Sequence, residues 1–468
     1  MSRCRLIRNL SVVVATTLAL SACSGGGSKQ GSGDGDGGAG ASCPVGALDT
    51  AKGTVEITFW HGLNRESETT LQRLTEQYND SQSKVAVKLV NQVGYAENFS
   101  KWKAGLGTGD LPDVAQMEDT TTQQMVDTQS IVPVEDCITA DGYDTEDFVP
   151  RILDRYRLEG RLVPMPFNVS NPVLYYDKNA FRAAGLDPND PPTTLAAVKA
   201  AARKIKAAGY ETGFGLKLNP WLVEQWAAKS GALYVNNQNG RNGRATKAVF
   251  GTQSSIDTFA WMKDMVDEGL ALTNPDDGPN GFDNLLGIRS KRNGMTIDSS
   301  AALGTISQVL ASGEGGGVEL GVGPMPGPTG SGGILVGGGA LYLSKSSAPE
   351  KIAAAWDYIK FLVQPDTQAD FAASTGYVPI RESSITEPVL VDRWKTEPGY
   401  RVAYDQLLNG KNDVATAGPV IGDYQSVRDI VKDAETRMLT EGQDPEEAIA
   451  EAVKLATEAI QAYNARVG

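Results

Sequence analysis

The chain has 468 residues but only one histidine, His61, and four cysteines. A single histidine cannot supply most histidine-based zinc sites, and it argues against a Ser-His-Asp hydrolase. The sequence contains neither a P-loop nor a G-x-G-x-x-G motif after a predicted strand, so the usual signatures of nucleotide binding are missing. We therefore predict that the protein is not an enzyme and that it binds no cofactor and no metal.

Only one long apolar run occurs, from Leu10 to Leu20, and three arginines precede it. This order predicts a secretory signal peptide over residues 1–22, too short to span a bilayer stably. Cys23 follows the sequence Leu-Ser-Ala, which is similar to a bacterial lipobox and implies cleavage before Cys23 and attachment of lipid to it. An ordinary signal peptide with an incidental cysteine is the alternative. The lipobox interpretation places a lipid-anchored protein on the extracytoplasmic face of the cell membrane.

Glycine and serine dominate residues 24–42 and predict a flexible coil, so we assign residues 23–52 to a lipidated tether. About 425 residues follow the Gly/Ser-rich stretch, enough for two domains. The predicted signal peptide contains three arginines and no acidic residue, which leaves 40 basic and 57 acidic residues and a net charge of −17. This acidic balance argues against nucleic acid or an anionic membrane surface as a partner.

Two cysteines, Cys43 and Cys137, remain after the predicted signal peptide and lipid site are set aside. A pair of cysteines outside the cytoplasm can form a disulfide. Cys43 precedes the first predicted strand, so a bridge would attach the N-terminal arm to its domain. The sequence does not give the separation of the two Cα atoms, so a disulfide and two free thiols both stay open.

The first part of the predicted folded region alternates strands and helices. Strands are expected at 55–60, 85–90 and 113–117, with helices at 69–78 and 97–106. This order predicts an α/β fold with a parallel or mixed sheet and right-handed crossovers. Ligands bind beyond the carboxyl ends of such strands, which here are Trp60-His61, residues 91–95 and Glu118-Asp119.

The rest of the chain continues the alternation. Strands are expected at 172–176, 213–218, 294–297 and 319–323, and helices at 195–208, 221–229 and 256–266. A threonine is expected to cap the helix at 195–208. Glycine and proline dominate residues 313–339, which we expect to be loops around the strand at 319–323. Apolar stripes at helical spacing predict two further helices, through 352–362 and 449–463.

Six short segments follow one another along nearly the whole mature chain. They are Phe59-Trp60-His61, 109–114 (GDLPDV), 173–178 (VLYYDK), 184–193 (AGLDPNDPPT), 354–362 (AAWDYIKFL) and 375–379 (TGYVP). Together they resemble motifs of the extracytoplasmic solute-binding proteins of ABC importers, in the carbohydrate-binding family. Within that family, residues 165–172 (MPFNVSNP), 296–300 (TIDSS) and the triplet Gly337–Gly339 are most similar to the binders of glycerol-3-phosphate and glycerophosphodiesters.

The resemblance implies a two-lobed α/β fold of the type II periplasmic-binding-protein class, with discontinuous domains joined by a hinge. On this basis we expect lobe 1 to comprise residues 53–165 and 295–345, and lobe 2 to comprise residues 166–294 and 346–468. A ligand that contacts both lobes only in the closed state would drive their closure. The implied role is capture of a small solute by a monomeric protein and its delivery to the permease subunits of an ABC transporter.

The resemblance also implies a ligand site. The carried-over positions are Tyr95, Asp119, Ser170, Trp221, Ser299, Ser300, Gly338 and Tyr377. A carboxylate can accept two hydroxyl hydrogen bonds from a polyol, an indole offers an apolar face to sugar C–H groups, and a glycine allows close approach of the backbone. Most positions have a structural alternative: a helix cap for the aspartate and for Ser299 and Ser300, packing for the aromatic residues, and a loop or hinge for the glycine. His61 is expected to be structural, and Trp60 to be part of the core.

One position departs from the phosphate binders. They carry an arginine two residues before the glycine that matches Gly422, where this chain has Val420, and Ala301-Ala302 stand in place of their glycine-serine. A buried phosphate dianion needs a cation, for which Arg428 is a candidate. We therefore expect a neutral sugar or polyol as the ligand, with glycerol-3-phosphate or glycerophosphodiesters as the alternative.

Two other functions compete with solute capture. Asp119 and Asp298 could supply the carboxylate pair of a secreted glycosidase. The protein could also be an adhesion lipoprotein whose cleft binds no solute. The lipobox and the importer-like segments argue against the glycosidase, whereas ligand-dependent compaction in solution would separate a receptor from an adhesion protein.

Overall fold

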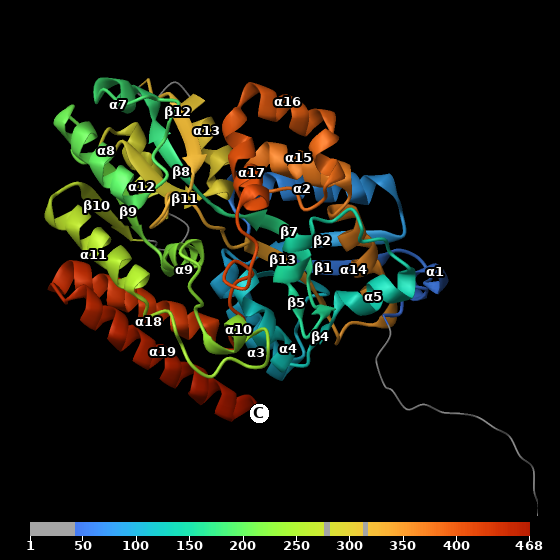
Figure 1. The fold of residues 1–468 in the computed structure, drawn as a ribbon. Helices are drawn as coiled ribbons and strands as arrows, with labels where there is room; N and C mark the ends of the chain where they lie inside the picture. The colour runs from blue at the N-terminus through green and yellow to red at the C-terminus, as the bar shows by residue number, and fades with distance from the viewer. Residues whose placement is uncertain (1–42, 276–280, 312–316) are drawn as a thin grey trace, which may run out of the picture. The chain divides into compact units, whose positions relative to one another are not determined.

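The computed structural model describes residues 43–275, 281–311 and 317–468 of the chain. Residues 41–468 form one compact unit, in which two large sheets carry most of the strands (Figure 1). The predicted signal peptide, the lipid site at Cys23 and the Gly/Ser-rich stretch lie outside the described residues. Within the described part, no helix is both long and apolar enough to cross a membrane.

The first sheet contains the three strands predicted nearest the N-terminus. Its order is β2-β1-β3-β13-β4, and β7 pairs with β13. The strands are β1 (Val55–His61), β2 (Val85–Asn91), β3 (Val114–Glu118), β4 (Ile131–Val132), β7 (Met165–Ser170) and β13 (Gly337–Ser344). β1 is parallel to β2 and β3, whereas β13 is antiparallel to β3, β4 and β7. The predicted parallel β-α-β-α-β arrangement is therefore confirmed and extended by antiparallel strands.

The second sheet has the order β10-β9-β11-β8-β12. Its strands are β8 (Pro172–Asp177), β9 (Phe214–Leu218), β10 (Ala271–Pro275), β11 (Met295–Ser299) and β12 (Leu320–Pro324). β9 is parallel to β10 and β11, and β8 is antiparallel to β11 and β12. A short hairpin of β5 (Arg157–Leu158) and β6 (Arg161–Leu162) stands apart from both sheets. We call the first sheet and the helices that pack on it the first lobe, and the second sheet and its helices the second lobe.

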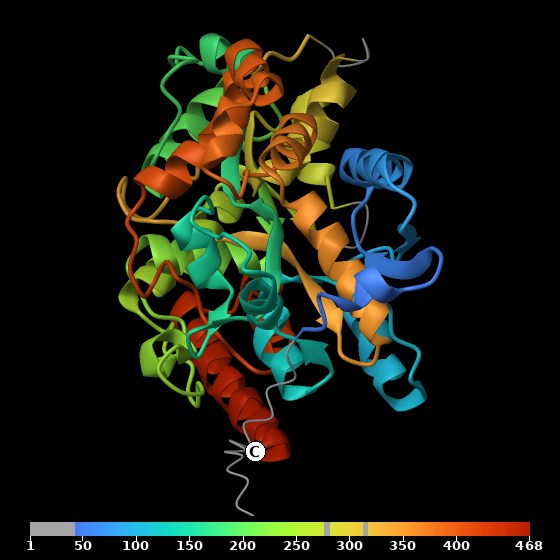
Figure 2. The ribbon, with the colours of Figure 1, turned by 90° about the vertical axis from the view of Figure 1, so that its right-hand side faces the viewer.

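Helices connect and cover the strands of the first lobe. They include α1 (Ala47–Thr50), α2 (Arg65–Ser81), α3 (Tyr95–Thr108), α4 (Thr122–Asp127), α5 (Val134–Asp141), α6 (Pro150–Arg155), α14 (Pro349–Leu362) and α15 (Pro365–Thr375). α14 contacts α1, β1 and β13, and α15 contacts α2 (Figure 2). The apolar stripe of α14 is buried, as its spacing predicts.

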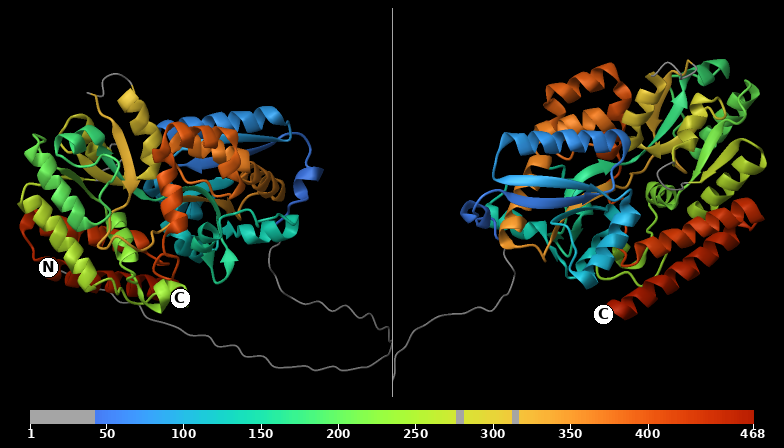
Figure 3. Two further views of the ribbon diagram at one scale, coloured as in Figure 1. Left: turned by 45° about the horizontal axis from the view of Figure 1, so that its top comes forward. Right: turned by 180° about the vertical axis from the view of Figure 1, so that it is seen from behind.

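The second lobe has its own set of helices. These are α7 (Lys178–Ala183), α8 (Leu195–Ala207), α9 (Pro220–Lys229), α10 (Asn236–Gly240), α11 (Gln253–Asp267), α12 (Asp283–Arg289), α17 (Val402–Asn409), α18 (Tyr424–Thr436) and α19 (Pro445–Val467). α18 and α19 run side by side and contact α9 and α11 (Figure 3). The side chain of Thr194 accepts a hydrogen bond from Ala197 N, which confirms the predicted cap of α8. α13 (Leu303–Ala311) and α16 (Pro388–Thr396) both contact α15.

A single residue separates the two lobes where β7 ends and β8 begins. This residue, Asn171, is buried, and its Nδ2 donates to Ala403 O at 2.9 Å. Gln406 Nε2 donates to Asn171 Oδ1 at 2.5 Å, so α17 packs directly on the crossing. The crossing is therefore held by side-chain hydrogen bonds and needs no loop.

The pairing of the strands divides the chain differently from the expected lobes. Residues 295–345 were expected in lobe 1, but β11 and β12 both pair with β8 in the second sheet. Residues from 346 onward were expected in lobe 2, but α14 packs on β1 and β13 of the first sheet. Residues 337–339 were expected to belong to a loop, yet they are the first residues of β13, which lies next to β3. Strand order depends on contacts between distant segments, which local periodicity does not report.

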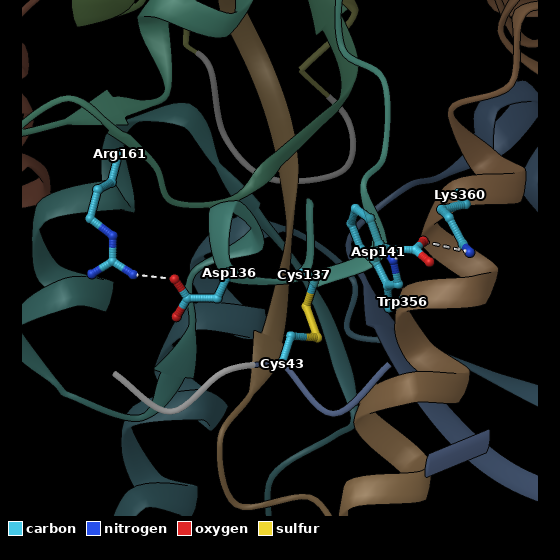
Figure 4. Close-up of a disulfide and its surroundings, with 7 residues drawn as sticks. All are labelled: Cys43, Asp136, Cys137, Asp141, Arg161, Trp356 and Lys360. Carbon is cyan, nitrogen blue, oxygen red and sulfur yellow. Dashed lines mark hydrogen bonds and ion pairs between the residues drawn. A yellow bond between two sulfur atoms is a disulfide. The ribbon is translucent and has the colours of Figure 1, made fainter. Parts of the chain in front are cut away.

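The N-terminal arm is part of the fold from Cys43 onward. Cys43 and Cys137 form a disulfide across a sequence separation of 94 residues, with 4.7 Å between their Cα atoms (Figure 4). The bridge attaches the arm to α5, and α1 packs against α14. Residues 43–52 therefore belong to the first lobe, although the tether was expected to extend to residue 52. Lys360 and Trp356 of α14 hydrogen-bond Asp141 at the other end of α5.

Candidate ligand-binding cleft

A cavity of about 510 Å³ lies where the carboxyl ends of β1, β2, β3, β9 and β11 meet. Strand ends that face one another from two sheets of this kind are the position expected of a ligand site. Its first-lobe wall is built from Gly62, Leu63, Asn64, Ser67, Val93, Gly94, Tyr95, Ala96, Glu97, Glu118, Asp119, Ser170, Gly338 and Tyr377. The rest of the described wall consists of Lys217, Asn219, Trp221, Gly281, Phe282, Asp298, Ser299, Ala301, Ala302 and Thr305.

The structure brings seven of the eight predicted site residues to this wall. They are Tyr95, Asp119, Ser170, Trp221, Ser299, Gly338 and Tyr377. Ser300 is not among the described wall residues: it is buried, and its backbone N–H donates to Asn171 O at 2.9 Å. Ser299 Oγ accepts from Ala301 N at 3.2 Å, so it also caps the short helical turn that follows β11. His61 is buried and precedes the wall residue Gly62, and burial lowers the pKa of its imidazole.

Trp221 stands at the start of α9 on the second-lobe side of the cavity. Asn219 Oδ1 accepts from Trp221 N at 2.9 Å and Pro220 occupies the first helical position, so the start of α9 is fixed. The indole lies against the backbone of Gly337, where an added Cβ would be 2.8 Å from Trp221 Cζ2. Trp221 is half-buried and faces the cavity, so the core-packing alternative accounts for only part of its surface.

Asp119 is paired with a cation that the sequence analysis did not identify. Arg155, the last residue of α6, donates from Nη2 to Asp119 Oδ2 at 2.5 Å and from Nε to the same oxygen at 3.2 Å. Its Nη1 donates to Pro419 O at 3.0 Å, and both side chains are buried. Burial raises the pKa of the Asp119 carboxyl to about 6, and the nearby Arg155 opposes this rise. The carboxylate therefore has one oxygen occupied by Arg155, and the other is left for a second donor.

Arg428 does not line the cavity and cannot serve as its cation. It donates from Nε and Nη2 to Glu224 at 2.7 and 2.9 Å, and from Nη1 to Glu118 at 2.6 Å. Glu224 belongs to α9 of the second lobe and Glu118 to β3 of the first, so Arg428 bridges the lobes. Its charge is balanced by two carboxylates, which corrects the idea that it replaces the arginine of the phosphate binders.

Lys217 is the one basic side chain among the described wall residues. Its Nζ lies 3.1 and 3.2 Å from the two carboxylate oxygens of Asp298 and 3.0 Å from Gly281 O. Against it stand four acidic residues of the wall, Glu97, Glu118, Asp119 and Asp298. The described wall is therefore acidic, and the ammonium group of Lys217 is already paired with Asp298.

Val420 is buried outside the cavity wall. Its N–H donates to Asn239 O at 2.8 Å, and the preceding carbonyl, Pro419 O, accepts from Arg155. Other wall residues that sequence reasoning missed are Lys217, Asn219 and Phe282. Lys217 is the second-last residue of the predicted strand β9, and Asn219 directly follows that strand. The rule that ligands bind at carboxyl strand ends could therefore have identified both.

Comparison with known proteins identifies the family of the chain. Residues 73–400 match the family described as bacterial extracellular solute-binding protein. The sn-glycerol-3-phosphate-binding periplasmic protein UgpB of Escherichia coli K12 is 26% identical over 427 residues, covering 89% of this chain and 95% of that protein. UgpB of Salmonella typhimurium LT2 is 27% identical over 414 residues, covering 86% and 92% of the two chains.

Solved structures show the fold independently. The structure of UgpB from Mycobacterium tuberculosis in complex with glycerophosphocholine matches with a TM-score of 0.73 at 22% identity, over 88% of this chain and 99% of that chain. The GacH receptor of Streptomyces glaucescens, solved unliganded and with acarbose, also matches with a TM-score of 0.73, at 21% identity over the same shares. The predicted two-lobed fold of the type II periplasmic-binding-protein class is confirmed.

Proposed function

Because the chain belongs to the family of bacterial extracellular solute-binding proteins, we propose that its cleft captures a neutral sugar or polyol for an ABC import permease. Solute capture is the role of the family. The choice of a neutral ligand rests on one observation, the acidic wall of the cavity. Four carboxylates face it, and the single lysine of the described wall is paired with Asp298.

A phosphate dianion fits such a wall poorly. Its burial must be offset by charge-assisted hydrogen bonds from cations, and arginine supplies these best. The two arginines nearest to the wall carboxylates, Arg155 and Arg428, are already bonded to Asp119, Glu118 and Glu224. A neutral polyol instead donates its hydroxyl protons to the carboxylate oxygens of the wall that the cations leave unoccupied.

The proposed contacts follow from the chemistry of each side chain. Asp119 accepts hydroxyl protons with the oxygen that Arg155 leaves unoccupied, and Trp221 packs its indole on the C–H face of the sugar ring. Tyr95 and Tyr377 supply phenolic hydroxyls from the first lobe. The remaining contacts are hydroxyl and backbone groups at Ser170, Ser299 and Gly338. Because these residues come from both lobes, the ligand holds the two lobes together.

The second candidate ligand is a glycerophosphodiester with a cationic head group. An ammonium beside an indole and carboxylates gains cation–π and charge interactions, so Trp221 and the acidic residues would suit it. UgpB of Mycobacterium tuberculosis was solved with glycerophosphocholine, which has such a head group. This alternative differs from sn-glycerol-3-phosphate, which has no positive charge to match the wall.

The remaining parts of the proposal concern the setting of the protein. We propose that lipid on Cys23 anchors a monomer to the extracytoplasmic face of the membrane and that the loaded protein docks on the permease. We also propose that it catalyses no reaction. Asp119 and Asp298, the two carboxylates that a glycosidase would need, are each paired with a cation, Arg155 and Lys217. Such pairing engages carboxylate oxygens that an acid or a nucleophile would need at the glycosidic bond.

Thermal unfolding in the presence of candidate solutes tests the ligand class. A ligand at one hundred times its Kd stabilises the native state by about 2.7 kcal/mol, which raises Tm by several degrees. We expect this rise with a mono- or disaccharide and its loss in Trp221→Ala, while Trp394→Ala, away from the described wall, should retain it. Stabilisation by sn-glycerol-3-phosphate alone would refute the neutral-ligand proposal.

A further inference from the structure

A row of buried side-chain amides lies beneath the first-lobe wall of the cavity. Gly62 N donates to Gln116 Oε1 at 2.9 Å, and Gln116 Nε2 donates to Asn168 Oδ1 at 2.8 Å. Asn168 Nδ2 then donates to the hydroxyl of Tyr95 at 2.7 Å. Gln116 and Asn168 are both fully buried, on β3 and β7, and neither lines the cavity.

The direction of every hydrogen bond in this row follows from its first member. A backbone N–H can only donate, so Gly62 requires the oxygen of the Gln116 amide to face it. The amide nitrogen of Gln116 must then face Asn168, which turns the oxygen of Asn168 toward Gln116 and its nitrogen toward Tyr95. The Tyr95 oxygen consequently accepts, and its own proton points away from Asn168.

The hydroxyl groups of Tyr95, Tyr377 and Ser67 extend this hydrogen-bonded row to the cavity. Asn168, Tyr95 and Ser67 all lie close enough to the Tyr377 hydroxyl for hydrogen bonding to act on its pKa, and Tyr95, Tyr377 and Ser67 line the cavity. Burial raises the pKa of Tyr95 and of Tyr377, so both phenols keep their protons. Because Asn168 reaches both phenols, each phenol oxygen can accept from the amide nitrogen, which leaves phenolic protons to donate toward a ligand.

We propose that Gln116 and Asn168 are positioning residues that make the Tyr95–Tyr377 pair a hydrogen-bond donor toward the ligand. The inference deepens the proposed function and rests on it, because it assigns what the ligand must present at this wall. That group is an oxygen with no proton of its own, such as the ring or bridging oxygen of a glycoside. A phosphodiester oxygen shares this chemistry. Asp119, on the same first-lobe wall, accepts protons, so a donor and an acceptor side by side orient the ligand.

Two glycines of β13 leave the space that Asn168 and Tyr95 of the row occupy. A Cβ on Gly339 would lie 2.7 Å from Asn168 Oδ1 and 2.9 Å from the Tyr95 hydroxyl. A Cβ on Gly338 would lie 2.0 Å from Asn168 O, and its φ of 102° also favours glycine. Two of the three glycines in the triplet therefore leave space for the amide row, and Gly338 also lines the cavity.

Two substitutions reverse the direction of the hydrogen bonds in the row and keep nearly the same side-chain shape. In Asn168→Asp, one carboxylate oxygen accepts from Gln116 and the other accepts the Tyr95 proton, which turns Tyr95 away from the ligand. In Gln116→Glu, the carboxylate accepts from both Gly62 and the Asn168 amide, so the Asn168 amide must flip and present its oxygen to Tyr95. Gln116→Glu thus reverses Tyr95 without touching it. Both variants are measured at pH 8, so that the new carboxyl is ionised.

The matched control is Gln92→Glu, which adds the same charge at the same edge of the first sheet. Gln92 is buried and its Oε1 already accepts a hydrogen bond from Lys101, so a carboxylate keeps that contact. The full chain is purified in detergent and titrated with maltose in one arm and with glycerophosphocholine in the other. The two arms separate a glycosidic oxygen from a phosphodiester oxygen as the acceptor.

We expect Asn168→Asp and Gln116→Glu each to raise the Kd of the bound probe about tenfold, the value of one lost neutral hydrogen bond. Gln92→Glu should change it less than about twofold. In a background that carries both Tyr95→Phe and Tyr377→Phe, Asn168→Asp should have no further effect, because both hydroxyls that it reverses are gone. Equal losses with and without the two hydroxyls, or unchanged binding in Gln116→Glu, would overturn the inference.

A spectroscopic readout tests the row even where no probe binds. The ¹³Cζ resonance of labelled Tyr95 responds to whether its hydroxyl donates to a carboxylate or amide oxygen. It should shift in the same direction in Asn168→Asp and Gln116→Glu, and stay in place in Gln92→Glu. An unshifted resonance in both folded variants would refute the proposed direction of the hydrogen bonds in the row. If the resonance shifts but wild-type protein binds neither probe, the row stands and the proposed ligand class fails.

Discussion

Acidification from pH 7 to pH 5 should weaken ligand binding through Asp119. Burial raises the pKa of this carboxyl to about 6, with Arg155 acting in the opposite direction. We propose that the ionised form accepts hydroxyl protons of the ligand, and protonation removes one of its acceptor positions. Binding should therefore follow the ionised fraction of Asp119.

The size of the effect follows from the titration. With a pKa near 6, the carboxyl is about nine-tenths ionised at pH 7 and about one-tenth ionised at pH 5. If only the ionised form binds, Kd rises about tenfold over this range, equivalent to about 1.4 kcal/mol. The sign for stability is opposite. The folded-state pKa lies above the ordinary value of 3.8, so the native state binds more protons between these values. Through this group alone, acidification stabilises the fold, so the loss of affinity does not arise from unfolding.

Calorimetric titrations at pH 7, 6 and 5, run on wild type and Asp119→Asn, measure the effect. Wild type should lose affinity progressively, whereas Asp119→Asn should bind weakly and nearly independently of pH. A pH slope that persists unchanged in Asp119→Asn would assign the titration to another group. Constant wild-type affinity from pH 7 to pH 5 would refute the proposed role of the carboxylate.

Three further predictions concern stability and packing. Replacing Cys43 and Cys137 by serine removes a bridge that closes a loop of 94 residues and should cost about 4–5 kcal/mol, visible as a lower Tm in calorimetry; an unchanged Tm would contradict it. Arg428→Met leaves two buried or partly buried carboxylates without their cation and should cost about 3–5 kcal/mol in urea denaturation, so an unchanged midpoint would refute the bridge. Gly339→Ala should raise Kd at least about tenfold by crowding the Tyr95 hydroxyl, while Gly107→Ala, where nothing lies within 4 Å of the added Cβ, should bind like wild type. Equal affinities of the two alanine variants would contradict the crowding.

Local patterns in the sequence predicted much of the secondary structure. Val55, Ile57 and Phe59 alternate along β1 and are all buried, as a period of two requires. Thr194 caps α8, and the apolar stripe of α19 packs inward. These features depend on residues within one or two helical turns or strand pleats, so they can be predicted from a single sequence.

Other features depend on segments far apart in the chain. The glycine triplet predicted a loop, yet it begins β13, where Asn168 and Trp221 leave no room for side chains. The pairing of β11 with β8 likewise changed the division into lobes. Glycine in a strand signals close packing only when the neighbouring segment is known.

The candidate site was predicted in outline but without its cations. Seven of the eight proposed residues line the cavity, and three of them, Asp119, Ser170 and Ser299, end or directly follow strands. Arg155 lies in no motif, and arginine is usually exposed, so its burial against Asp119 could not be predicted. The disulfide was left open for the same reason, because it depends on the distance between two distant Cα atoms.

Calorimetric titration of the purified protein against neutral mono- and disaccharides, glycerophosphocholine and sn-glycerol-3-phosphate tests the central claim most directly. The account predicts that a neutral sugar binds with a Kd in the micromolar range or below, about −8 kcal/mol or better, and that sn-glycerol-3-phosphate does not compete. Tight binding of sn-glycerol-3-phosphate with no binding of any neutral sugar would contradict it.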